Sequence, residues 1–133
     1  MALQYSVAVN NARLDAIESA IGVSAVLKIF TGAPPANCAA ANSGTVLATL
    51  ALPSDWMSAA AAGVKAKLGT WQDAAADATG TAAHWRLYAT DGVTCHAQGT
   101  YGTSGTDMIG DSVSFTAGQT FTVNSFSLTA ANT

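Results

Sequence analysis

Hydrophobic and polar residues alternate along most of this chain with the two-residue period of a β-strand. Gly, Pro, Asn and Asp stand between the short apolar runs, and these residue types favour turns. About seven or eight strands are therefore expected, at residues 26–30, 45–52, 64–68, 84–88, 93–98, 113–115, 121–123 and 126–128. Because nothing resembles a βαβ crossover, we expect a mainly β domain, an antiparallel jelly-roll-like β-sandwich with one short N-terminal helix.

Two neighbouring strands are expected to form a hairpin around Asp91 and Gly92. Both residue types tolerate the positive φ that a tight two-residue turn needs. In the strand before this turn, Trp85 and Leu87 share one face. We therefore expect a central strand with one buried face and Trp85 in the core.

Two further segments carry an alternation that assigns side chains to a face. Val64, Ala66 and Leu68 alternate with Lys65 and Lys67. The pattern predicts a half-exposed strand whose lysines point into solvent.

Near the end of the chain the apolar positions change parity, from Phe121 and Val123 to Phe126. Because a strand keeps one parity on each face, this change predicts a bulge or a switch of sheet near Asn124 and Ser125. Such irregularities form the corners of sandwiches and barrels.

The start of the chain is divided into an N-terminal arm, residues 1–9, and a short helix, residues 10–22, before the β-sandwich domain of residues 23–133. Asn10 or Asn11 is expected to cap the helix, and Gly22 to end it. The helix is expected to dock through an apolar stripe, which consists of Leu14, Ile17 and Ile21. The alternating arm residues are candidate interface residues, either as a strand added to a neighbour or as an edge strand of the same sheet. These arm residues are Leu3, Tyr5, Val7 and Val9.

Composition indicates a surface suited to contact with other protein. The chain is 50% hydrophobic and 10% charged, against roughly 25% charged residues in ordinary soluble domains. Low charge gives little repulsion between copies, so a homodimer or another homo-oligomer is expected. The net charge of −3 argues against nucleic acid as a partner. No signal peptide or membrane-spanning run is expected, which favours synthesis in a cytoplasm.

No catalytic site, metal site or cofactor is predicted. Cys38 and Cys95 are expected as free thiols or as a disulfide. A zinc site shared by these cysteines with His84 and His96 is disfavoured, because Cys95 and His96 are adjacent on a strand and point to opposite faces. The aspartate pairs, Asp73 with Asp77 and Asp107 with Asp111, are expected to form turns through backbone amides.

Three aromatic residues outside the expected central strand are further candidates for an interface. Trp56 follows a turn, Trp71 opens a polar loop, and Tyr101 lies in a turn-rich segment. Exposed aromatic rings stack on sugars or anchor protein interfaces. Trp56 and Trp71 are each expected either to anchor an interface or to cover the core.

Several segments resemble a group of small tailed-phage virion proteins. They are LKIFTGAPPA at 27–36, GTVLATL at 44–50, GTSGTDM at 102–108, AGQTFTV at 117–123 and FSLT at 126–129. The likeness covers most of the chain and is to capsid cement or decoration proteins of the jelly-roll type. It implies a non-enzymatic protein on the outer capsid surface of a virion, made in the bacterial host cytoplasm, that bridges major capsid protein subunits and reinforces the shell.

A second function stays open at this point. A tail or fibre module of the same β-sandwich class would bind carbohydrate or a receptor through exposed rings of Trp56, Trp71 or Tyr101. The solvent exposure of these side chains separates the two possibilities.

Overall fold

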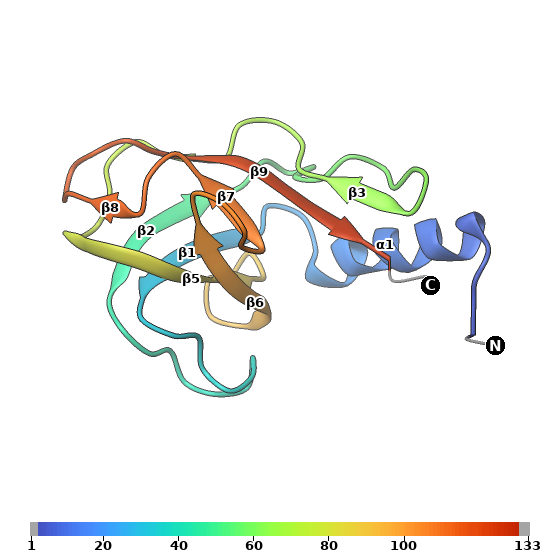
Figure 1. Ribbon diagram of the computed structural model, residues 1–133, viewed down its shortest axis with the longest axis horizontal. Helices are drawn as coiled ribbons and strands as arrows, with labels where there is room; N and C mark the ends of the chain where they lie inside the picture. The colour runs from blue at the N-terminus through green and yellow to red at the C-terminus, as the bar shows by residue number, and fades with distance from the viewer. Residues whose placement is uncertain (1–2, 131–133) are drawn as a thin grey trace.

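The computed structural model describes residues 3–130 and is mainly β with one N-terminal helix (Figure 1). The helix lies to one side of a strongly curled sheet that forms a half-barrel. In chain order the elements are α1 (Val7–Ile21), β1 (Val26–Thr31), β2 (Val46–Ala51), β3 (Val64–Ala66), β4 (Gln72–Asp73), β5 (Gly80–Tyr88), β6 (Cys95–Gly102), β7 (Met108–Gly110), β8 (Ser114–Phe115) and β9 (Phe121–Thr129). Among residues 3–130, no helix is both long and apolar enough to span a membrane.

The described strands form a single mixed sheet in the order β2-β1-β5-β6-β7-β9-β3, with β4 added to β9 and β8 added to β5. Neighbouring strands are antiparallel except β6 and β7, which pair in parallel at Tyr101 with Met108 and at Gly102 with Ile109. The purely antiparallel, two-sheet arrangement expected from the sequence is therefore not what the strands form. Alternation reports which residues share a face, and it carries no information about strand direction.

The concave side of the sheet encloses an aromatic core. Trp71 packs between Trp56 and Phe126, with ring centroids 6.0 and 5.6 Å away, and Trp85 meets Phe126 edge-on at 5.3 Å. Trp85 is buried, as predicted. The predicted irregularity in β9 is confirmed: Ile109 pairs with Ser125 and the next residue of β7 pairs with Val123, which leaves Asn124 as a bulge. This extra residue lets apolar side chains on both sides of it face inward.

The predicted hairpin joins β5 and β6, which pair antiparallel. The tight two-residue turn is wrong: the connection runs over residues 89–94, and of Asp91 and Gly92 only Gly92 has a positive φ. The connection is fixed by Asp91, whose carboxylate accepts hydrogen bonds from the backbone amides of Val93 and Thr94 at 2.8 and 2.9 Å. These amides, together with the Thr94 hydroxyl, lower the pKa of Asp91 to about 2.

Strand β5 is buried on both faces, which corrects the expectation of one buried face. His84, Arg86 and Tyr88 are as buried as Trp85 and Leu87. The second face is covered by the loop between β1 and β2, residues 32–45, which we call the covering loop. Sequence alternation could not reveal this cover, because the loop has no regular hydrophobic period.

Helix α1 begins earlier than predicted. Val7 and Val9 belong to its first turn, and Ser6 caps it by accepting a hydrogen bond from the Val9 amide at 3.2 Å. Asn10, expected as a cap, lies inside the helix and is buried. The extended arm at residues 1–9 is therefore wrong for residues 7–9, and residues 1–2 lie outside the described part of the chain. The end of the helix at Gly22, with φ of 95°, is confirmed.

The side chains of β3 alternate between two faces, as predicted. However, the face expected in the core is exposed, and the face expected in solvent is buried. Val64 is 40% exposed, whereas Lys65 is 2% exposed. The Lys65 ammonium is 2.7 Å from Asp15 and 2.9 Å from Glu18, both on α1. The solvated Lys65 expected from the sequence is thus wrong, because the face of α1 that covers β3 carries carboxylates.

The ion pairs fix the charge of the groups that join α1 to β3. Burial on its own would lower the pKa of Lys65, but the hydrogen bonds with Asp15 and Glu18 outweigh burial and raise it. The hydrogen bond from Lys65 and the one from the Ala60 amide lower the pKa of Asp15. A carboxyl group whose pKa is lowered by folding stabilises the fold at pH values above its ordinary pKa. A basic group whose pKa is raised by folding stabilises the fold at pH values below its ordinary pKa. The Lys65–Asp15 pair therefore contributes fully between pH 3.8 and pH 10.5.

We predict that Lys65→Met lowers the free energy of unfolding by about 2 kcal/mol at neutral pH, because it leaves two carboxylates facing an apolar side chain. Lys67→Met is the matched control, since Lys67 is more exposed and its ammonium contacts a backbone carbonyl. Urea unfolding of both variants across pH measures the difference. Equal stability of the two variants, or a difference that persists unchanged in strong acid, would contradict this account.

Candidate functional site

Three polar side chains of helix α1 bind the segment that leads into β3, whereas Arg13 and Ser19 are exposed. The carboxamide oxygen of Asn11 accepts a hydrogen bond from the Gly63 amide at 3.0 Å. Asp15 accepts one from Ala60 at 2.9 Å, and Glu18 accepts one from Met57 at 3.0 Å. These three side chains thus hold the segment that leads into β3.

The opposite face of α1 is exposed and mainly apolar, with Arg13 and Ser19 as its polar residues. Val9 is 43% exposed and Ile17 is 39% exposed. Exposed alanines recur every fourth residue, which places them along one ridge of the helix; they are Ala8, Ala12, Ala16 and Ala20. We call Val9, Ile17 and these alanines the outer face of α1. A helix that is apolar where it meets solvent normally has a partner there.

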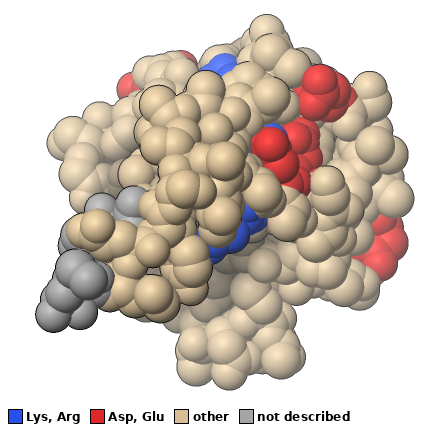
Figure 2. Space-filling view, turned by 90° about the vertical axis from the view of Figure 1, so that its right-hand side faces the viewer, with Lys and Arg blue, Asp and Glu red and all other residues tan. Residues whose placement is uncertain are grey.

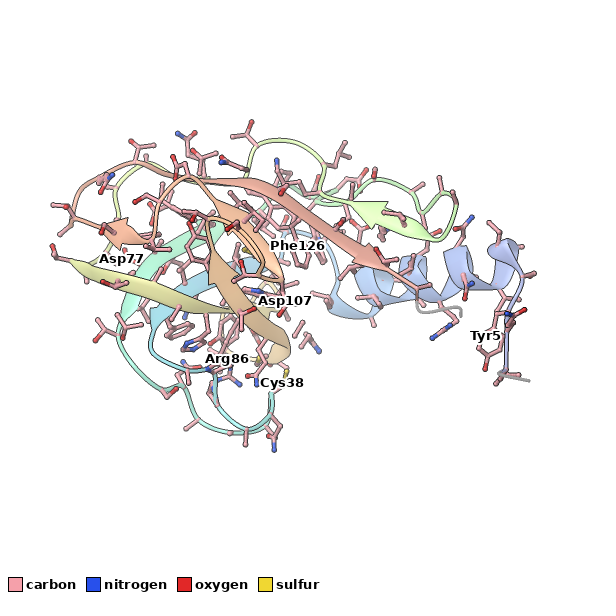
Figure 3. The ribbon with its side chains drawn as sticks, in the orientation of Figure 1. Tyr5, Cys38, Asp77, Arg86, Asp107 and Phe126 are labelled. Atoms are coloured by element: carbon pink, nitrogen blue, oxygen red, sulfur yellow. The ribbon has the colours of Figure 1, made fainter. Side chains whose placement is uncertain are left out.

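Residues before the helix extend this apolar surface. Leu3 is 75% exposed, Tyr5 42% and Val7 58%. Tyr5 lies under the guanidinium of Arg13, with 5.0 Å between Arg13 Cζ and the ring centroid. The structure therefore places the predicted interface residues of the N-terminal arm at the helix end of the molecule, where Figure 3 labels Tyr5. Their role as contacts stays a prediction.

An open groove of about 480 Å³ runs beside the helix. Arg13, Leu14 and Ile17 of α1 line it, together with Thr129 of β9 and the residue after it. Figure 2 looks at this end of the molecule and shows mostly uncharged surface with a few separate acidic and basic patches. Ile17, expected to dock on the domain, instead lines this groove and remains partly exposed.

The outer face was only partly predictable from the sequence. Val9 was found through its alternation with the residues before it, although that alternation belongs to the start of a helix. The alanines at every fourth position indicate a helix by propensity, but they do not indicate which face of it is exposed. Ile17 was assigned to the buried stripe, which Leu14 and Ile21 do form.

The aromatic candidates lie inside the fold. Trp56 and Trp71 are fully buried, and Tyr101 is 3% exposed. Trp56 donates its indole hydrogen bond to the carbonyl of Gly22 at 2.9 Å, and Tyr101 donates its hydroxyl to the carbonyl of Ser112 at 2.7 Å. Buried rings with satisfied polar atoms offer no stacking surface to a sugar. In this structure they cover and fill the core.

The second polar cluster lies under the covering loop. Arg86 is 1% exposed and donates to the side-chain oxygen of Asn42 at 2.5 Å and to the carbonyl of Cys38 at 2.8 Å. Tyr88 donates to the same Asn42 oxygen at 2.6 Å, and Gln98 donates to the carbonyl of Pro35 at 2.6 Å. Within residues 3–130 no carboxylate forms an ion pair with Arg86. The loop carbonyls and amide therefore solvate a buried cation.

His84 extends this cluster along β5. Its Nδ1 lies 2.6 Å from the carbonyl of Gly32, and its ring stacks on Phe30 with 4.9 Å between centroids. Burial lowers the pKa of His84, and its neighbour Arg86 lowers it further, which favours the neutral ring. Nδ1 then carries the hydrogen that the Gly32 carbonyl accepts.

The aspartate candidates Asp73 and Asp77 meet at Thr49, whose amide and hydroxyl donate hydrogen bonds to them at 3.0 and 2.7 Å. Asp73 accepts from the amides of Thr49 and Ala75, and Asp107 accepts from the amide of Thr100, as expected of aspartates that bond to backbone. Within residues 3–130 no three His, Cys, Asp or Glu side chains come together as a metal-binding group. Cys38 and Cys95 are both half-buried free thiols.

We predict that Arg86→Met detaches the covering loop and lowers the free energy of unfolding by about 3 kcal/mol, because the amide and carbonyl groups that now bind the guanidinium lose their donor. Arg86→Lys should not restore stability, since one ammonium cannot reproduce the planar fork. Arg13→Met, at an exposed arginine, is the control. Hydrogen exchange of residues 33–44 gives the local readout, and unchanged protection in Arg86→Met would refute the assignment.

Comparison of the chain with protein-family models, curated proteins and solved structures found no match. The functional proposal therefore depends on this chain's own residues. Two features stand out in the described part: the apolar outer face of α1, and the buried cation beneath the covering loop.

Proposed function

We propose that this protein is a structural, non-enzymatic component of a tailed-phage virion that binds the outer surface of the capsid shell and stabilises it by bridging major capsid protein subunits. The observation that supports it best is the orientation of α1, whose acidic side chains bind β3 and the segment before it while Val9, Ile17 and four alanines meet solvent. Such a helix is suited to be covered by another protein. The resemblance to cement proteins supplies the identity of that protein.

The energetics fit a protein that occupies many equivalent sites. Alanine and valine side chains lose little hydration when they are covered, and each buried Å² of apolar surface contributes about 25 cal/mol. A shell presents the same site repeatedly, so modest contacts act together through avidity when the protein bridges subunits or associates with itself. The proposal accordingly includes a homodimer or another homo-oligomer on the shell, and synthesis in the host cytoplasm.

The proposal names jelly-roll cement proteins because of the sequence resemblance alone. A compact, curled β body that carries a projecting apolar element would serve this purpose. The strand order β2-β1-β5-β6-β7-β9-β3 is not in itself an argument for that family. The tail or fibre module is not proposed, because the rings on which it relied are buried.

We predict that Val9→Glu combined with Ile17→Glu reduces association with expanded capsid shells of the same phage at least tenfold, because two carboxylates would have to lose their hydration in the contact. Co-sedimentation of purified protein with shells measures binding. Val93→Glu, at a valine that is 78% exposed in the β5–β6 hairpin, is the matched control and should bind normally.

The folded state of the double variant is checked by its unfolding midpoint, which should stay close to that of the wild type because both positions are exposed. Normal binding of a folded double variant would reject the outer face as the contact. If the wild-type protein fails to bind shells at all, the capsid proposal itself is wrong.

A second prediction concerns the residues before the helix. Deletion of residues 1–5 keeps Ser6, the cap of α1, so the helix should remain and the unfolding midpoint should change little. Binding to shells should weaken because Leu3 and Tyr5 are removed from the apolar surface. Binding equal to that of the full chain would show that these residues make no contact.

A further inference from the structure

The covering loop is held to the sheet by hydrogen bonds to neutral groups. Arg86 and Tyr88 of β5 bind Asn42 and the carbonyl of Cys38, and Gln98 of β6 binds Pro35. Within residues 3–130 the loop makes no ion pair with the sheet. Each attachment can therefore break and reform without a covalent change.

Cys38 belongs to this loop, and Cys95 is the first residue of β6. The β5–β6 register places Cys95 opposite Tyr88, on the side of the sheet where Arg86 reaches the Cys38 carbonyl at 2.8 Å. Figure 3 shows Cys38 next to Arg86 below the half-barrel. Residues 38 and 95 are distant in the sequence, and the fold brings them to one place.

The two thiols lie close together, because the Cys38 thiol is among the groups that raise the pKa of Cys95. The Cys95 thiol donates to the carbonyl of Ala97 at 3.5 Å. Both cysteine side chains are half-buried, so small oxidants can reach them. Burial raises the pKa of Cys95, and its contact with Cys38 raises it further, while the Arg86 guanidinium opposes these effects. Tyr88 also faces this group, and burial raises the pKa of its hydroxyl. Cys95 is thus mostly protonated at neutral pH, and its oxidation should speed up in mild alkali.

We propose that Cys38 and Cys95 form a redox-sensitive pair, and that oxidation by a small disulfide such as oxidised glutathione joins them in a disulfide bond that fastens the covering loop to β6. One cysteine thiolate attacks a sulfur of oxidised glutathione, forms a mixed disulfide and releases one glutathione thiolate. The thiolate of the other cysteine then attacks the protein sulfur of the mixed disulfide and releases the second. Two thiol protons leave the protein, and oxidised glutathione is reduced to two molecules of glutathione.

Such a bond would close a long loop and would restrict the unfolded chain more than the folded one. Loop closure of this length raises the folding equilibrium constant by roughly a thousandfold. It would also keep the carbonyl of Cys38 on Arg86, so the buried cation would stay covered when the rest of the loop moves. The reduced protein keeps the same fold with a loop that separates more often.

The test uses the full wild-type chain, incubated with oxidised glutathione in mild alkali and then alkylated and examined by mass spectrometry. The expected product is a monomer that is lighter by two hydrogens and resists alkylation, with a linked pair of peptides that contain Cys38 and Cys95. Cys38→Ser and Cys95→Ser should each stop at a mixed disulfide with glutathione. The proposal is overturned if the wild type forms only glutathione adducts or disulfide-linked dimers. It is also overturned if the folded chain does not react under conditions in which the urea-unfolded chain does.

A second measurement tests whether the disulfide holds the covering loop in its native position or forms only when the loop has separated from the sheet. Hydrogen exchange of residues 33–44 should slow in the oxidised wild type, and its unfolding midpoint should rise above that of the reduced protein. Both effects should disappear in Cys38→Ser and Cys95→Ser under the same oxidant. Faster exchange of the loop after oxidation, or a lower midpoint, would show that the bond distorts the native arrangement and would contradict the proposal.

Discussion

The attachment of α1 to β3 through Lys65 determines which side of the helix meets solvent. A buried ammonium must be compensated by charges or carbonyls, and Asp15 and Glu18 supply the carboxylates at 2.7 and 2.9 Å. These two residues, with Asn11, lie on one side of the helix, so that side has to face β3 and the segment before it. The remaining side, which includes Val9 and Ile17, is then exposed because the polar side is already bound. The apolar outer face is therefore a consequence of the buried charge.

In the described part of the chain a second buried cation, Arg86, is compensated without carboxylates. Arg86 is buried on β5, and it obtains its hydrogen bonds from Asn42 and backbone carbonyls of the covering loop. Because an uncompensated guanidinium in an apolar interior would be strongly destabilising, the covering loop is required for the sheet to be stable on that face. Loop and strand thus depend on each other, and the position of Cys38 beside Cys95 follows from the same contact.

The sequence predicted local features more successfully than the arrangement of strands. The hairpin at Asp91 and the bulge at Asn124 could be predicted because each depends on a few neighbouring residues. The assignment of Lys65 to solvent was wrong because parity defines two faces without saying which of them is covered, and the cover came from α1, far away in the sequence. The parallel pairing of β6 with β7 was also not predictable, since alternation is the same for either strand direction.

The start of the helix was misplaced for a related reason. Ser6 lacks the Glu or Gln three residues later that would complete a capping box, and Val9 stands there instead. Alternating apolar residues before Asn10 favoured an extended arm, although a helix that is apolar on its solvent side shows the same residues. The predicted arm residues are exposed, although Val7 and Val9 belong to a helix and not to an extended arm.

The low charge of the chain acquires a more specific meaning once the buried groups are known. Of the five Lys and Arg residues, Lys65 and Arg86 are both buried and engaged in internal contacts. Asp15 and Glu18 are bound to Lys65, so part of the acidic complement is also used inside the molecule. The surface therefore carries less charge than the composition implies. Weak repulsion between copies and an apolar helix at one end both favour association with other protein, and they arise from the same use of charge to hold the fold together.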